Sequence, residues 1–123
     1  MMEDYCGVVM RYQVTDADTA AQVGSGDVPV LATPRLIAWL EAATVQAAAP
    51  FAGPGQTTVG TAVRIEHRRA THVGGTVEVT AEPSPIDGRL LTFQVKAIDD
   101  SGQLVAQGEI DRIIVDRQKF LGR

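Results

Sequence analysis

The sequence feature that most constrains the fold is a long apolar segment, residues 31–50, that is bounded by helix start and stop signals. Thr33 is a good N-cap residue and Pro34 suits the first helical position, where no backbone N–H is needed. Pro50 ends the helical pattern. One helical face carries four apolar residues in register: Leu36, Leu40, Ala43 and Ala47. The segment therefore predicts one long helix that the rest of the chain largely covers.

Glu41 is one of only two charged residues in this predicted helix, the other being Arg35. At 100° per residue the two lie roughly 120° apart around the helix, so Glu41 leans toward the apolar side. A carboxylate at the margin of a buried face can simply reach water or a neighbouring arginine. It can also serve a reaction, and the helix alone does not decide between these interpretations.

Length and composition predict a single domain, residues 1–123, with a sizeable core. The net charge of −4 and the pI near 5.0 argue against nucleic acid as a partner. The single Cys6 excludes an internal disulfide, and no Cys/His spacing fits a metal site, which favours a reducing compartment and hence the cytoplasm. The start of the chain lacks a signal-peptide pattern, and no apolar run is long enough to span a membrane.

Five segments carry the alternation of a β-strand, and they are separated by turn residues: 6–14, 57–69, 76–83, 89–98 and 103–115. The last four follow the helix and are joined by short connections, so we expect an antiparallel sheet with one covered face. Residues 15–29 are rich in acids, Ala, Gly and Ser and predict a mobile loop of the kind that often forms a lid. The order indicates an α+β fold in which the helix covers a curved sheet.

The strand at residues 57–69 has a covered row and a charged row. We expect Val59, Thr61, Val63, Ile65 and His67 to face the helix, and Gly60, Ala62, Arg64, Glu66 and Arg68 to face away from it. The alternation of the last strand blurs after Asp111, which predicts a bulge or an additional covered surface. A sheet of this length needs more cover than one helix provides. A second copy of the chain would supply it, so we expect a homodimer or a higher homo-oligomer.

Three polar residues fall at or near the covered side: Thr33, Glu41 and His67. A hydroxyl, a carboxylate and an imidazole are the groups that activate a nucleophile or orient a water molecule. Each also has a structural interpretation, because Thr33 can be a helix cap and His67 a satisfied histidine at the core edge. The pattern of residues leaves both sets of roles open.

From about Val30 to Phe120 the sequence resembles the fluoroacetyl-CoA thioesterase family of hot-dog proteins. The similar segments are Val30-Leu31-Ala32-Thr33, Leu40-Glu41, Ala49-Pro50-Phe51, Gly60-Thr61-Ala62, His67, Ala70-Thr71, Val77-Glu78-Val79-Thr80-Ala81-Glu82, Asp87-Gly88-Arg89 and Lys119-Phe120. The resemblance implies a hot-dog fold, in which one long helix packs on a curved antiparallel sheet of about five strands.

The resemblance also implies a reaction, the hydrolysis of a short or modest acyl-CoA thioester to the free acid and CoA. It assigns catalytic roles to Thr33, Glu41 and His67 and binding of the thioester carbonyl to Gly60, with no metal and no cofactor. Whether Thr33 or Glu41 bonds to the acyl group stays open. The family's lid carries an aromatic residue, whereas residues 25–29 contain none. The acyl group, and the choice between CoA and an acyl-carrier protein, therefore also stay open.

The main alternative is a non-catalytic module of the same fold that binds acyl-CoA or regulates in response to it. The presence of all three polar residues favours hydrolysis. An enoyl-CoA hydratase is a third alternative, but the Asp/His pattern associated with that branch is not evident. Release of thiol from acyl-CoA would separate hydrolysis from binding alone.

Overall fold

The computed structural model describes residues 7–122. Its strands and helices follow the chain in the order β1 (Val8–Gln13), η1 (Asp16–Asp18), α1 (Ala20–Val23), α2 (Thr33–Ala48), η2 (Ala49–Phe51), β2 (Gln56–His67), β3 (Thr76–Pro83), β4 (Leu90–Asp99), β5 (Leu104–Asp116) and α3 (Arg117–Phe120). The predictions for Cys6 and for the residues before it lie outside the described residues.

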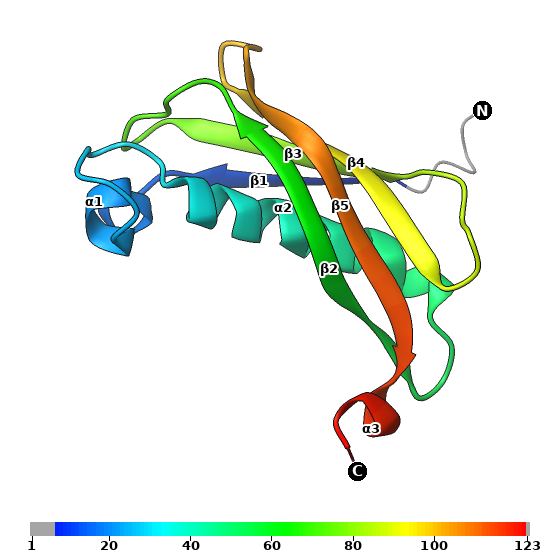
Figure 1. The fold of residues 1–123 in the computed structure, drawn as a ribbon. Coiled ribbons are helices and arrows are strands. Elements are labelled where there is room, and N and C mark those ends of the chain that lie inside the picture. Colours follow the sequence, from blue (N-terminus) through cyan, green and yellow to red (C-terminus); the bar gives the residue numbers. More distant parts are fainter. Residues whose placement is uncertain (1–6, 123) are drawn as a thin grey trace.

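The five strands form one antiparallel sheet in the order β1-β3-β4-β5-β2. Helix α2 lies along one face of this curved sheet, while β2 and β5 run diagonally past it (Figure 1). The predicted α+β architecture, with one long helix on five antiparallel strands, is confirmed. Strands β1 and β2 are the two edges, so β2 pairs with β5 on one side only.

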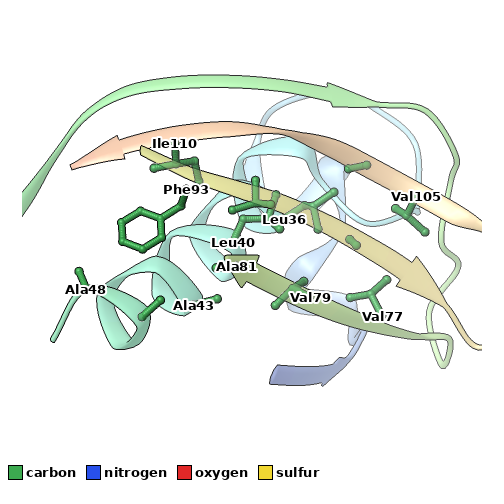
Figure 2. Close-up of a cluster of buried hydrophobic side chains, with 14 of the residues drawn as sticks. Leu36, Leu40, Ala43, Ala48, Val77, Val79, Ala81, Phe93, Val105 and Ile110 are labelled. Carbon is green, nitrogen blue, oxygen red and sulfur yellow. The ribbon is translucent and has the colours of Figure 1, made fainter. Parts of the chain in front are cut away.

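The core fills the space between α2 and the sheet, as Figure 2 shows. The helix contributes the predicted apolar face with Leu36 and Leu40, and β4 contributes Phe93 from the strand opposite. The alternation predicted for β3 and β4 holds, because every second residue is buried: Val77, Val79, Ala81, Leu91, Phe93, Val95 and Ala97. A one-residue slip of either strand would expose this whole row, so the alternation fixes the pairing of the two strands.

The segment 15–29 is more ordered than the loop predicted from its composition. It contains the short helices η1 and α1, and the Thr19 hydroxyl caps α1 by accepting from the backbone N–H of Gln22. A hydrogen bond from Ala20 N–H to the Val30 carbonyl joins α1 to the residues just before α2. The cap at Thr19 stabilises α1 although helix-breaking residues follow it. The prediction of a loop was based on composition and did not consider this cap. We call residues 15–29 the lid segment.

A β-bulge in β2 corrects the predicted alternation of that strand. Gly60 pairs with Arg112 and Ala62 pairs with Asp111, so Thr61 is an extra residue. The extra residue reverses the two faces on its N-terminal side. Gly60 therefore faces the helix rather than solvent, and His67, beyond the bulge, keeps its predicted side. The sequence analysis considered a bulge after Asp111 in β5. The bulge lies instead in β2, in the part that pairs with Asp111 and Arg112.

In strand β5 the buried side continues through Arg112 to Ile114. This agrees with the additional covered surface that the sequence predicted, as one of two alternatives, after Asp111. Because Arg112 is charged, the regular alternation of β5 could not be recognised in the sequence at this point. The position of Arg112 opposite the β2 bulge brings it into the candidate site.

Candidate active site

The first part of the site is a hydrogen bond between Thr33 and His67. The Thr33 Oγ1 atom lies 2.7 Å from His67 Nδ1. Thr33 is the first residue of α2 and not its N-cap, since Ala32 holds that position without a side-chain bond. The predicted capping role is wrong because the hydroxyl is engaged by the imidazole. Helix α2 and the end of β2 thus bring a hydroxyl and an imidazole into direct contact, an arrangement in which a hydroxyl can be activated as a nucleophile.

His67 is half-buried at the C-terminal end of β2. Burial lowers its pKa below the ordinary value of 6.5, while the backbone of Arg69 raises it in part. The side chain is therefore neutral at pH 7. When the Thr33 hydroxyl donates to Nδ1, the ring proton sits on Nε2, a buried atom with no hydrogen-bond partner among the described residues. A neutral imidazole with a free lone pair on Nδ1 is the form that accepts a proton.

A pocket of about 340 Å³ opens beside this pair. Its walls come from the lid segment, from the start of α2 and from the residues that follow β2: Ala20, Ser25, Gly26, Asp27, Val28, Val30, Leu31, Thr33, His67, Arg68, Arg69 and Ala70. A larger hollow of about 730 Å³ lies on the opposite face of the sheet, around Arg64 and Glu109. It contains none of the predicted site residues, so the smaller pocket is the one that the chemistry favours.

The second part of the site surrounds Glu41, in the middle of α2. Its side chain is 39% exposed, and its Oε2 atom lies 3.8 Å from a terminal nitrogen of Arg112. The carboxylate also packs on the backbone of Gly60, where a Cβ atom would lie only 2.6 Å from Oε2. The absence of a side chain at residue 60 is therefore what lets Glu41 approach β2.

Arg112 is a site residue that the sequence did not single out. It is only 7% exposed. Its Nε donates to the Thr58 hydroxyl at 2.9 Å and a terminal nitrogen donates to the Thr58 carbonyl at 3.1 Å. Burial lowers the pKa of the guanidinium, and the negative charge of Glu41 raises it in part. The signal in the sequence was an arginine in the covered row of a strand, since such residues are almost never buried without a partner.

Within one chain the two parts of the site are separate. Glu41 follows Thr33 by eight residues, or roughly 12 Å of helix rise. Gly60 precedes His67 by seven residues, or roughly 20 Å of strand. The structure thus brings Thr33 to His67 and Glu41 to Gly60. No hydrogen bond or ion pair between the two pairs is present among the described residues.

Residues 7–122 contain no group of three or more His, Cys, Asp or Glu side chains that could hold a metal ion. The same residues include no helix with the length and apolar character needed to cross a membrane.

Comparison with known proteins places this chain in a family. The family model of the fluoroacetyl-CoA-specific thioesterase FlK matches residues 14–118. The fluoroacetyl-CoA thioesterase of Streptantibioticus cattleyicolor is 37% identical over 91 residues, which cover 74% of this chain and 65% of that protein. The match thus spans just under two thirds of the relative's length.

Solved structures agree with the sequence comparison. A structure of FlK has a TM-score of 0.86 at 30% identity, with 94% of this chain and 90% of that chain covered. A hot-dog-like protein from Thermanaerovibrio acidaminovorans, 20% identical, has a TM-score of 0.85 over 95% of this chain and 86% of its own. The predicted hot-dog fold is confirmed, and the chain belongs to the FlK family of fluoroacetyl-CoA-specific thioesterases.

Proposed function

We propose that this protein is a thioesterase that hydrolyses a short acyl-CoA to the free acid and CoA. Membership of the FlK family supports the reaction class. The observation that carries the proposal is the 2.7 Å contact between Thr33 Oγ1 and His67 Nδ1. A module that only binds acyl-CoA has no need for a hydroxyl held on a neutral imidazole. The pocket of about 340 Å³ beside the pair favours a small acyl group.

In the proposed reaction Thr33 is the nucleophile and His67 is the general base. His67 Nδ1 takes the hydroxyl proton as Thr33 Oγ1 attacks the thioester carbonyl. The tetrahedral intermediate then expels the CoA sulfur, which takes the proton from His67, and an acyl ester of Thr33 remains. Water hydrolyses this ester, with His67 again accepting a proton and returning it to Thr33. The carboxylic acid leaves, and the starting protonation states are restored.

Glu41 and the backbone of Gly60 would complete this site on the carbonyl side. Backbone N–H groups stabilise the charge that develops on the carbonyl oxygen, and a carboxylate orients the attacking water. Glu41 of the same chain is held at Gly60, roughly 12 Å of helix away from Thr33. The set therefore requires Glu41 and Gly60 from a second copy.

The free edge of β2 supports a homodimer that would supply them. We consider two β2 strands that pair antiparallel about a two-fold axis near Arg64. In this pairing Ala62 lies opposite the partner's Glu66. Because Thr61 is the extra residue of the bulge, Gly60 then lies opposite the partner's His67, and both face the helices. Each site would contain Thr33 and His67 from one subunit and Glu41 from the other.

Thiol release from a panel of acyl-CoA substrates tests the proposed function. We expect turnover of short acyl-CoA by the wild-type protein and its loss in Thr33→Val, which keeps the side-chain shape and removes the hydroxyl. Thr33→Ser keeps the hydroxyl and should retain measurable turnover. CoA binding without thiol release by the wild-type protein would instead establish a binding module. Acyl-pantetheine and acyl-carrier protein in the same panel identify the carrier.

The proposed place of action is the cytoplasm. The chain has one cysteine and therefore no internal disulfide, as expected in a reducing compartment. Activity assays of fractionated cells, with the protein detected by an antibody, test this assignment.

A further inference from the structure

The short helix α3 and the residue that caps its end present two large apolar side chains to solvent. Phe120 is 57% exposed and Leu121 is 55% exposed. The helix is held in place, because the Asp116 side chain accepts from Lys119 N–H and Arg117 N–H donates to the Gly55 carbonyl. Adjacent exposed apolar residues on an anchored element indicate a contact surface.

The charges on α3 identify the kind of surface that it fits. Arg117 and Lys119 form no ion pair within residues 7–122, so α3 is basic as well as apolar. The lid segment is its complement, with three acidic residues and no basic one. Of these acids Asp18 pairs with Arg35 at 3.2 Å, while Asp16 and Asp27 have no ion pair among the described residues. A basic apolar helix and an acidic lid attract each other.

Within one chain these two surfaces cannot meet. Helix α3 is anchored beside the start of β2 through Gly55, whereas the pocket and the lid segment lie beyond the other end of that strand. Figure 1 shows α1 and α3 at opposite ends of the molecule. The twelve residues of β2 separate them by roughly 40 Å.

Antiparallel pairing of two β2 strands removes this separation. The start of one strand then lies beside the end of the other. Helix α3 is anchored beside the start of β2, and Arg68 to Ala70 of the pocket follow its end. The α3 helix of each subunit is thereby carried toward the lid segment of its partner. This step rests on the homodimer of the proposed function.

We propose that α3 of one subunit docks on the lid segment of its partner and closes the pocket beside Thr33 and His67. Phe120 and Leu121 supply the apolar contact, and Arg117 and Lys119 face the acidic residues of the lid. Each active site then includes a wall from the other subunit. Docking excludes water from the acyl group and holds the lid over bound substrate.

Cross-linking tests the docking without any requirement for activity. The chain Cys6→Ser/Ser25→Cys/Leu121→Cys carries one thiol on the lid segment and one on α3. We expect a short bismaleimide to convert it to covalent dimers, whereas chains with only one of the two new cysteines stay monomeric on a denaturing gel. A protein that is dimeric by light scattering and gives no such product overturns the proposal. A monomeric protein overturns both the proposal and the homodimer on which it rests.

Kinetics test whether the docked helix contributes to the site. We expect Phe120→Ala to lower kcat/KM for the best acyl-CoA about tenfold, as truncation of a buried aromatic contact does. The matched control is Val9→Ala, because Val9 is 55% exposed on the far edge strand β1. It should leave kcat/KM unchanged. Equal rates for Phe120→Ala and wild type in an active dimer would overturn the role of α3 and leave the proposed reaction standing.

Discussion

The two ends of the candidate site differ in how their polar groups are held. Thr33 and His67 are joined directly by one short hydrogen bond, and both lie next to an open pocket. Glu41 is held by a buried arginine and by contact with a glycine backbone, so its position depends on Thr58, Gly60 and Arg112 together. In the proposed mechanism the first end, which we call the reactive pair, supplies the nucleophile and the base, and the second end, which we call the charged support, positions the carboxylate of Glu41. This difference predicts that mutations at the two ends have different signatures.

The largest effect is expected at the reactive pair. His67→Ala removes the base that activates Thr33, and we expect kcat to fall by about 10²- to 10⁴-fold, the usual contribution of general acid–base catalysis. Because His67 is at the end of β2 and only half-buried, the melting temperature should change little. Normal turnover in this variant would show that His67 has only a structural role. The two ends of the site would then not differ in the way proposed here.

The pH dependence of turnover sharpens the assignment of the base. Burial lowers the pKa of His67 below 6.5, so the neutral form that accepts the proton persists to lower pH. We expect kcat/KM to be flat at neutral pH and to fall about tenfold per unit below the His67 pKa. The lowered pKa also makes the stability of the fold depend on pH. The contribution of His67 to the free energy of unfolding is largest above pH 6.5, where the side chain is neutral in both states, and it falls as the pH drops to the lower pKa of the folded state. An acidic limb centred above 6.5 would contradict this account.

A smaller effect is expected at the charged support. In Gly60→Ala the added Cβ would lie 2.6 Å from Glu41 Oε2, so the carboxylate must move. We expect about a tenfold loss of kcat, because small displacements of a positioned group are costly in catalysis. Gly53→Ala is the matched control, since its Cβ meets only Gln56 Oε1 at 3.4 Å. Equal turnover in both variants would show that the position of Glu41 does not affect the reaction.

The smallest effect is expected at Thr58, which acts through Arg112. Thr58→Val removes the hydroxyl that accepts from Arg112 Nε and should lower the free energy of unfolding by about 1 kcal/mol. The matched control is Thr57→Val, because Thr57 makes no side-chain hydrogen bond among the described residues. Chemical denaturation of both variants measures the difference. A cost at Thr57 as large as that at Thr58 would contradict the anchoring role.

The fold, and the positions of Thr33 and His67 at the covered side of the sheet, could be predicted from local patterns. Their catalytic roles were implied by the family resemblance and stay a prediction. The strict alternation of β3 and β4 identified the core, and the apolar face of α2 identified the residues that cover the sheet. His67 lies beyond the bulge, where the alternation again holds. Thr33 was expected at the helix start, where the sequence left a capping role and a catalytic role open, and the structure shows its hydroxyl on His67 and not on the backbone.

Glu41 and Gly60 were named through the resemblance, but their contact could not be predicted from the alternation of β2, because it depends on one extra residue. The bulge at Thr61 turns Gly60 to the helix side, and no local pattern in β2 announces it. Arg112 was hidden for a related reason, since its burial is satisfied by Thr58 and Glu41, which are distant in sequence. Long-range polar contacts of this kind follow from the tertiary fold.

The central claim is that each active site combines Thr33 and His67 of one subunit with Glu41 of its partner. Co-expression of His67→Ala and Glu41→Gln chains with different tags tests it most directly. Purified mixed dimers contain one complete site and should show about half the wild-type turnover, whereas each variant alone should show about a tenfold loss or more. Mixed dimers as inactive as their two parents would contradict the claim and place all three groups in a single chain.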